Sequence, residues 1–193
     1  MNWTLFLILV LVVVLFYVVS TYNFFVSSKA RIKASIQEIG NQLKRQAELI
    51  PNLISSAKGY LKHEKGIFDK LTDARKTISR AIESGDIQKM SDAGGKLSSL
   101  LPDLKVVVES NPEIKGAEVV DNLMNELRDT SDKVMYARRL LIDLSADYNV
   151  KRATFPSNLI ASIFGFEEMQ GLKTPEGKIE VKESEMETPK VDL

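Results

Sequence analysis

Residues 32–57 read IKASIQEIGNQLKRQAELIPNLISSA, and this stretch decides the fold because its apolar residues recur at alternating steps of four and three. Continued to Ala81, the spacing visits fifteen positions, of which thirteen are apolar. Such spacing places apolar residues along one face of a helix, as in a coiled coil. We therefore expect a long helix over residues 32–81. We call the fifteen positions the first seam; Gln46 and Glu64 are its two polar members. The seam consists of Ile32, Ile36, Ile39, Leu43, Gln46, Ile50, Leu53, Ala57, Tyr60, Glu64, Ile67, Leu71, Ala74, Ile78 and Ala81.

Three residues inside this expected helix disfavour a straight one. Pro51 lacks an amide proton and crowds the carbonyl group four positions earlier, so a kink is expected near Ala47. The neighbouring Asn52 side chain can bond backbone groups that the proline frees. Gly59 and Gly66 weaken the turns that follow. Because the spacing keeps its phase past all three, we favour a bent continuous helix over two separate helices.

Two shorter seams follow. Gly85 suits a left-handed helix cap and Asp86 an N-cap, so one helix ends and another begins there. Pro112 and Pro156 bound the third seam. The second seam is Ile87, Met90, Gly94, Leu97, Leu101, Leu104 and Val108, with Pro102 as an irregularity, and the third is Val120, Leu123, Leu127, Thr130, Val134, Ala137, Leu141, Leu144 and Tyr148. Joined by short polar turns, the three long helices predict an antiparallel all-α bundle, with a short helix and a Gly165 turn after Pro156.

The amino-terminal residues carry no charged side chain before Lys29, and sixteen of the seventeen residues 3–19 are apolar. A helix of about 20 apolar residues, and at least about 17, crosses a bilayer core of about 30 Å. We expect an anchor over residues 1–26 rather than a cleaved signal peptide, because a positive n-region and small residues at a cleavage site are missing.

Lys29, Arg31 and Lys33 follow this segment, whereas no Lys or Arg precedes it. Positively charged flanks tend to stay in the cytoplasm, so we expect the amino terminus outside and the bundle in the cytoplasm of a cell membrane. The same three residues are candidate lipid contacts, since a base beside an anionic leaflet gains about 1 kcal/mol.

The amino-acid composition argues against several kinds of binding and catalytic site. The chain has 26 basic and 26 acidic residues, no cysteine and one histidine, which argues against nucleic-acid binding, disulfides and Cys- or multi-His metal sites. His63-Glu64 could begin a zinc-protease motif, but this motif requires a second histidine at position 67, where the chain has isoleucine. Gly94-Gly95-Lys96 lacks the earlier glycine of a phosphate loop, and small residues there suit a close helix contact. We expect no catalytic residue, metal or cofactor.

Residues 167–193 contain eight acidic and four basic residues, two prolines and no aromatic residue. Such a segment cannot bury enough apolar surface to order itself, so we expect a disordered acidic tail. Its net charge of −4 leaves +4 on residues 1–166, because the whole chain sums to zero. The expected organisation is an anchor at 1–26, a bundle at 27–166 and the tail at 167–193.

Short motifs run through residues 20–166 in a characteristic order. They are Tyr22-Asn23, Gln42-Leu43-Lys44-Arg45, Leu49-Ile50-Pro51-Asn52-Leu53, Lys58-Gly59-Tyr60, His63-Glu64, Ala74-Arg75, Asn111-Pro112-Glu113-Ile114-Lys115, Ala137-Arg138-Arg139, Tyr148-Asn149, Phe155-Pro156-Ser157-Asn158 and Gly165-Phe166. In order and spacing these motifs resemble the LemA family of bacterial proteins. The resemblance implies one membrane anchor, a four-helix type of bundle and no established enzymatic activity. The fourth helix would come from a divided first helix or from the segment after Pro156. Family members commonly end soon after the Gly-Phe motif, so the tail departs from the pattern, and the lipobox cysteine of some relatives is lacking.

Besides the candidate lipid contacts Lys29, Arg31 and Lys33, two further sets of residues are candidate functional surfaces. Lys44, Arg45, Pro51 and Asn52 form a candidate hinge or partner surface, against the plainer interpretation of a shaped bend and a solvated face. Phe155, Phe164 and Phe166 form a candidate apolar patch, which either closes the end of the bundle or is exposed for binding.

The function that we expect is a non-enzymatic interaction or scaffold role at the bacterial envelope, with an unidentified protein partner or self-association. The second seam is shorter than the first, so the first needs either the longer third helix or another subunit to cover it. The alternatives are a lipid-binding or membrane-remodelling module and, less favoured, an enzyme using His63 with Glu64 or Asp69.

Overall fold

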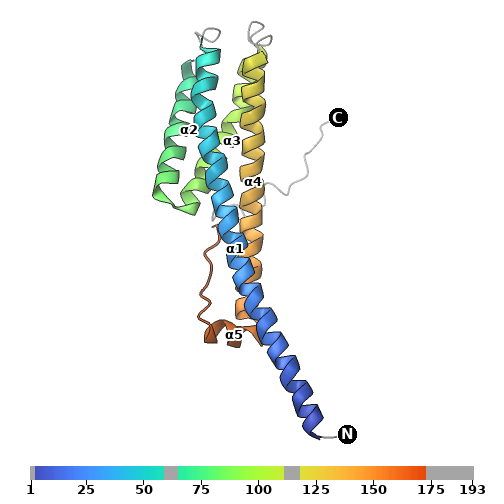
Figure 1. The fold of residues 1–193 in the computed structure, drawn as a ribbon. Coiled ribbons are helices and arrows are strands. Elements are labelled where there is room, and N and C mark those ends of the chain that lie inside the picture. Colours follow the sequence, from blue (N-terminus) through green and yellow to red (C-terminus); the bar gives the residue numbers. More distant parts are fainter. Residues whose placement is uncertain (1–2, 59–64, 111–117, 173–193) are drawn as a thin grey trace, which may run out of the picture.

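The computed structural model describes residues 3–58, 65–110 and 118–172, and every regular element in these ranges is a helix. The all-α class expected from the sequence is therefore confirmed. The elements are α1 (Trp3–Ala57), α2 (Lys65–Ser84), α3 (Ile87–Ser110), α4 (Glu118–Ala153) and α5 (Ser157–Ile163), as Figure 1 shows.

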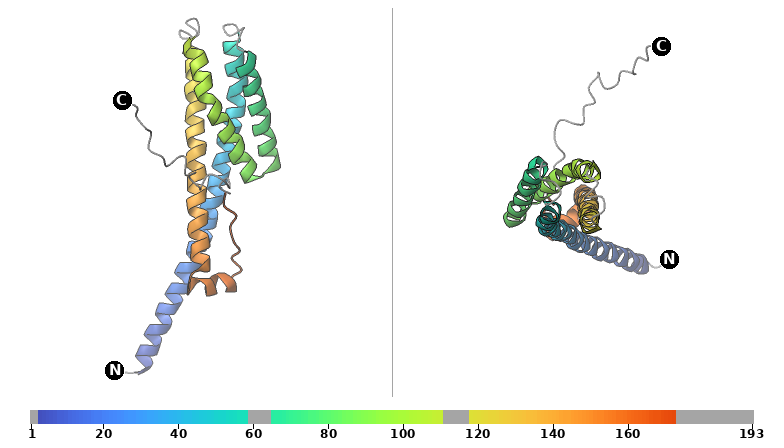
Figure 2. Two further views of the ribbon diagram at one scale, coloured as in Figure 1. Left: turned by 180° about the vertical axis from the view of Figure 1, so that it is seen from behind. Right: turned by 90° about the horizontal axis from the view of Figure 1, so that it is seen from above.

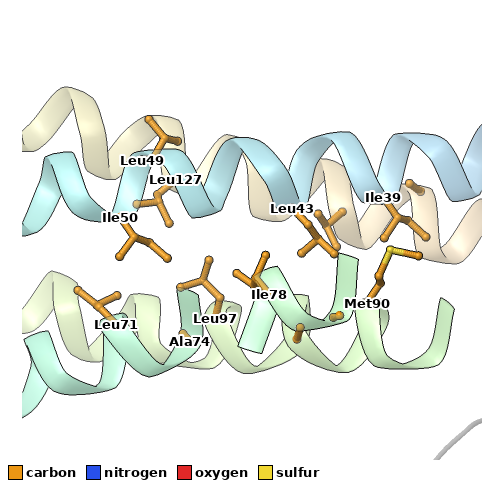
Figure 3. Packing of buried hydrophobic residues seen from close by; sticks show 14 of the residues in the cluster. Ile39, Leu43, Leu49, Ile50, Leu71, Ala74, Ile78, Met90, Leu97 and Leu127 are labelled. Atoms are coloured by element: carbon orange, nitrogen blue, oxygen red, sulfur yellow. The ribbon is translucent and has the colours of Figure 1, made fainter. Parts of the chain in front are cut away.

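The two longest helices, α1 and α4, lie side by side, and the shorter α2 and α3 cover them at the end far from the amino terminus (Figures 1 and 2). α1 contacts each of the other four helices. Seen from above, α1 to α4 surround a common core (Figure 2). Figure 3 shows side chains of all four helices meeting there, among them Leu43 of α1, Ile78 of α2, Leu97 of α3 and Leu127 of α4.

The expectation of one continuous helix over residues 32–81 is wrong. α1 ends at Ala57 and α2 begins at Lys65, and the two helices pack against each other. Within the described ranges the first predicted helix is thus divided into α1 and α2, which pack together with α3 and α4. Seam positions on both sides of the division are buried, from Ile50 and Leu53 to Leu71. Tyr60 and Glu64 of the first seam, together with Gly59, lie outside the described residues.

The burial of the seams otherwise follows the prediction. All nine positions of the third seam are buried or half-buried in α4, and Leu97 and Leu104 of the second seam are buried in α3. The part of the first seam in α1, from Ile32 to Ala57, packs into the core that α2, α3 and α4 share, and α4 makes the most extensive contact with α1 as a whole. The longer α4 thus contributes to the cover, which was one of the two alternatives, and self-association stays a prediction.

Three glycines predicted to end a helix or to allow a close helix contact do so in the structure. Gly85 has φ of 64° and Asp86 caps α3, since its Oδ1 accepts hydrogen bonds from the amides of Gln88 (2.8 Å) and Lys89 (3.1 Å). Gly165, with φ of 66°, turns the chain after α5. At Gly94 a Cβ atom would lie 2.9 Å from Cγ1 of Val134, so α3 and α4 approach closely there.

Candidate functional site at the amino-terminal end of the bundle

Among the described helices, α1 alone is long and apolar enough to cross a membrane. Only 6% of its most apolar window is buried, so this part of α1 is not a core helix of the bundle. Burial begins at Thr21 and recurs at Phe25, Ser28 and Ile32, where α1 enters the bundle. One uninterrupted helix therefore joins the apolar segment to the folded domain.

Aromatic rings from three parts of the chain meet where α1 enters the bundle. The buried Phe25 ring stacks on that of Phe166 at 4.8 Å and meets that of Tyr148 of α4 edge-on at 5.3 Å. The Tyr22 ring lies 5.0 Å from that of Phe164 and 5.6 Å from that of Phe166. We call these five residues the junction cluster. It fixes the segment after α5 against α1, and burial raises the pKa of the Tyr148 hydroxyl.

The short helix α5 is attached to the end of α4. The Ser157 hydroxyl lies within hydrogen-bonding distance of the carbonyl oxygens of Lys151 (2.6 Å) and Thr154 (2.8 Å) near the end of α4. Ser157, Ile160 and Ala161 are buried, and α5 contacts both α1 and α4. These contacts hold α5 in place even though it is only seven residues long.

The candidate apolar patch divides into two parts. Phe166 turns inward into the junction cluster and is half-buried, which fits the closing of the bundle end. Phe155 is 75% exposed and Phe164 is 50% exposed, which fits a binding patch. The exposed part also includes Leu159 and Ile163 of α5, which the candidate set did not include. Their signal in the sequence was the absence of charge from residue 153 to 166.

The candidate lipid contacts Lys29, Arg31 and Lys33 are all exposed on α1, just beyond the junction cluster. Two further bases of α4 lie nearby and were missed. Lys151 Nζ is 5.9 Å from the centre of the Phe24 ring, and Arg152 Nη2 is 3.2 Å from Glu168 Oε2. The contact of Lys151 with α1 and that of Arg152 with Glu168 depend on how α4 packs, which the local sequence does not show.

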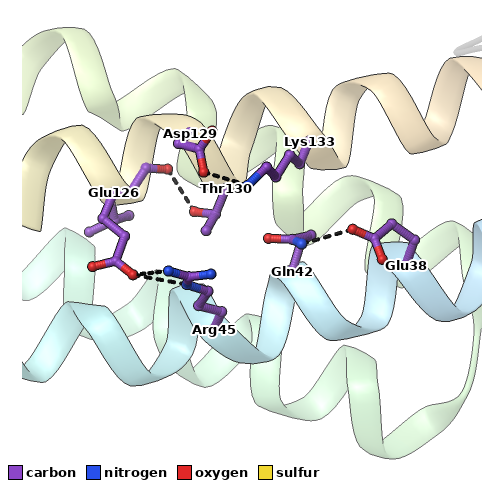
Figure 4. A network of polar contacts seen from close by, with 8 residues as sticks. Glu38, Gln42, Arg45, Glu126, Asp129, Thr130 and Lys133 are labelled. Atoms are coloured by element: carbon purple, nitrogen blue, oxygen red, sulfur yellow. Dashed lines mark hydrogen bonds and ion pairs between the residues drawn. The ribbon is translucent and has the colours of Figure 1, made fainter.

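Lys44 and Arg45, the basic part of the candidate partner surface, differ in their surroundings. Lys44 is exposed. Arg45 forms an ion pair with Glu126 of α4, and its Nε donates to Glu126 Oε1 at 2.9 Å (Figure 4). The hydrogen bond to Glu126 raises the pKa of Arg45. Arg45 thus links two helices of its own chain, which leaves Lys44 as the freer basic group.

Pro51 is half-buried within α1, and Asn52 is exposed. The carbonyl oxygen that Pro51 deprives of its helical donor belongs to Ala47, and this oxygen accepts a hydrogen bond from Arg75 Nε of α2 at 3.1 Å. The backbone group freed by the proline is therefore bonded by a neighbouring helix, and not by the Asn52 side chain. This hydrogen bond links α2 to α1 next to Pro51.

The remaining candidates concern chemistry and the tail. His63 and Glu64 lie outside the described residues. In the ranges that the structure describes, no group of three or more His, Asp or Glu residues is placed to hold a metal ion. The start of the predicted tail, up to residue 172, packs on α4, where Asn149 Nδ2 donates to the Met169 carbonyl at 2.8 Å and its Oδ1 accepts from the Met169 amide at 3.0 Å. Residues 173–193 lie outside the described residues.

An all-helical bundle continuous with one apolar helix defines the class of protein. A sequence model of the LemA family matches residues 35–192, and the chain belongs to this family. The match includes the acidic tail, so the expectation that the tail lies beyond the family pattern is wrong. The magnetosome protein MamQ of Magnetospirillum gryphiswaldense is 24% identical over 172 residues, which cover 77% of this chain and 63% of MamQ. The chain thus spans less than two thirds of that relative.

Proposed function

We propose that this protein is a single-pass membrane protein whose bundle serves as a non-enzymatic docking scaffold at the bacterial envelope. The observation that carries the proposal is the course of α1. Its side chains are exposed or half-buried up to Ser20, and from Thr21 onward the same helix is packed in the bundle, with the first seam beginning at Ile32. A helix that is apolar and exposed at one end and packed at the other suits a domain held directly on a bilayer.

Charge supports the proposed orientation, with the amino terminus outside and the bundle in the cytoplasm. Lys29, Arg31 and Lys33 are exposed immediately after the apolar segment, where positively charged residues favour the cytoplasmic side. Because the chain lacks cysteine, single cysteines report accessibility without background labelling.

The test replaces Tyr136, which is exposed on α4, with cysteine in the full chain. A membrane-impermeant maleimide should label this cysteine in inside-out vesicles and leave it unlabelled in intact spheroplasts. A matched Asn2→Cys variant should show the reverse. Labelling of Tyr136→Cys in spheroplasts would overturn the orientation, and extraction of the protein by alkaline carbonate would overturn the anchor.

Partner docking is supported by the contrast between Lys44 and Arg45. Lys44 and Asn52 are exposed on α1, whereas Arg45 is engaged by Glu126. A photo-crosslinking amino acid at Asn52 in native membranes should yield a reproducible crosslinked protein, and Lys44→Glu should reduce its yield. Lys105→Glu, on α3, is the control that should leave the yield unchanged. Recovery of monomer alone from Asn52 and from other exposed bundle positions would refute the scaffold function.

A further inference from the structure

The exposed face of α5 is unusually apolar for the surface of a folded domain. Phe155, Leu159, Ile163 and Phe164 are each at least half exposed, and Phe155 and Ile163 reach 75% and 77%. No charged residue occurs from residue 153 to 166. Clustered exposed apolar side chains of this kind mark sites of contact with another apolar phase.

The junction cluster places this face at a definite distance along α1. The Phe164 ring lies against Tyr22, with 5.0 Å between ring centres. At 1.5 Å per residue, Tyr22 lies about 28 Å along the helix from Trp3, close to the thickness of about 30 Å of a bilayer core. If α1 spans the membrane from Trp3, Tyr22 and therefore Phe164 lie at its far boundary.

The direction of α5 is suited to that boundary. α5 lies across the end of the bundle, beside the point where α1 continues alone toward the amino terminus (Figures 1 and 2). Its buried residues Ser157, Ile160 and Ala161 face the bundle, so its exposed side faces away from the bundle. An amphipathic segment that runs across a spanning helix is oriented to lie in the plane of the membrane interface.

The nearest charged groups are arranged for lipid headgroups. Lys29 lies about 10 Å farther along α1 than Tyr22, and Arg31 and Lys33 follow it. On α4, Lys151 and Arg152 precede the uncharged stretch, and Glu167 and Glu168 follow it, with Glu168 paired to Arg152. The five bases near this face therefore outnumber these two acids. Basic side chains farther along α1 than the apolar face would lie at the level of anionic lipid headgroups when that face contacts the acyl chains.

We propose that α5, together with Phe155 and Phe164, lies in the interfacial region of the leaflet that α1 leaves, with its exposed apolar face in contact with lipid acyl chains. This inference rests on the proposed function to the extent that α1 spans the bilayer. It adds a second, in-plane membrane contact made by the carboxyl-terminal part of the domain. The continuity of this face with the apolar segment of α1 favours lipid over a second copy of the chain.

Tryptophan fluorescence tests the contact in the full chain. Trp3 is the only tryptophan, so Trp3→Phe provides a background for the single probes Leu159→Trp and Ile163→Trp. The proteins are reconstituted into phosphatidylcholine–phosphatidylglycerol vesicles whose acyl chains are plain or brominated. We expect bromine to reduce the emission of both α5 probes by about twofold, as for a side chain at the acyl boundary.

Two controls separate the possible outcomes. Phe16→Trp, exposed within the apolar segment of α1, reports the anchor. Tyr136→Trp, exposed on α4 about 18 Å from Tyr148, should keep its emission. Quenching of Phe16→Trp without quenching of the α5 probes would overturn the inference and leave the anchor standing. Absence of quenching at Phe16→Trp would instead refute the anchor itself.

If another protein rather than lipid covered the exposed face of α5, the fluorescence result would differ. A second copy or another protein would shift the emission of the α5 probes to the blue, without bromine quenching at any ratio of protein to lipid. That result would also overturn the inference. Circular dichroism of each variant, compared with the parent, shows that the bundle is intact. Because the substituted side chains are exposed, the helical signal should not change.

Discussion

Arg75 of α2 donates a hydrogen bond of 3.1 Å to the carbonyl oxygen of Ala47 in α1. This oxygen is the one that an amide at position 51 would bond in a regular helix, and Pro51 has no amide proton. The guanidinium therefore replaces a missing backbone donor and ties two helices together at the same point. The proline is tolerated inside a long helix in part because a side chain from the neighbouring helix satisfies the oxygen.

Removal of Arg75 should matter only while the proline is present. Arg75→Ala should lower the stability of the full chain in mild detergent by about 1 kcal/mol, or a few degrees in the thermal midpoint. In a Pro51→Ala background the new amide bonds Ala47, so the same substitution should cost no more than a few tenths of a kcal/mol. Thermal unfolding followed by circular dichroism measures the four variants of this cycle. Equal losses in the two backgrounds would show that Arg75 stabilises the fold in some other way.

Gly94 and Gly95 should respond differently to alanine. At Gly94 a Cβ would lie 2.9 Å from Val134 Cγ1 and 3.3 Å from Leu43 Cδ2, so Gly94→Ala should destabilise the bundle by about 1–3 kcal/mol. At Gly95 the nearest atom is Arg138 Nη1 at 3.6 Å, and Gly95→Ala should be neutral or gain up to about 1 kcal/mol of helix propensity. Val134→Ala should recover part of the loss at Gly94. A stable Gly94→Ala variant would show that α3 and α4 can move apart without cost.

Gln46 is the polar member of the first seam in α1, and it is buried. Its Nε2 donates to the Ser131 hydroxyl of α4 at 3.0 Å. Ser131→Ala should cost about 1–3 kcal/mol, because it leaves a buried amide without its partner. The double variant Gln46→Leu/Ser131→Ala should regain most of that stability, because both polar groups are gone. A double variant as unstable as Ser131→Ala would show that the cost is steric.

Asp86 should make the stability depend on pH. Hydrogen bonds from the amides of Lys89 and Gln88 lower the pKa of this carboxyl below its ordinary value of 3.8. A lowered pKa in the folded state stabilises the fold above the ordinary pKa, and this stabilisation is lost as the pH falls through the folded value. The thermal midpoint of the parent relative to Asp86→Ser, a neutral N-cap, should therefore be constant down to about pH 5 and fall below about pH 4. A difference that does not change with pH would refute a contribution from the charge.

The seam spacing predicted the core well because spacing is a local property. Ile39, Leu43 and Leu141 are buried where the alternation of four and three places them. The same spacing could not reveal the division between Ala57 and Lys65. Both α1 and α2 face the same core, so each shows the same kind of spacing, and here the two stretches are in phase with each other. Gly59 and Gly66 were the local signals against a continuous helix, and the intact phase outweighed them.

The candidate surfaces were predictable only as far as they depend on neighbours in the chain. The exposure of Lys29 and its companions follows from the end of the apolar segment. The pairing of Arg45 with Glu126 and the stacking of Phe25 on Phe166 join residues far apart in the sequence. These contacts depend on the register between helices and on the return of the chain after α5, and periodicity within one helix fixes neither.

The unbroken course of α1 has a mechanical consequence. From Tyr22 to Ala57 the helix extends about 52 Å, and it is stiffened by the helices packed around it. If α1 spans the bilayer as proposed, a change of about 10° in its tilt, such as bilayers of different thickness impose, would displace the far end by about 9 Å. The domain would then act as a lever that converts bilayer thickness into lateral displacement. Lipid composition could in this way select which neighbours the distal end of the bundle reaches.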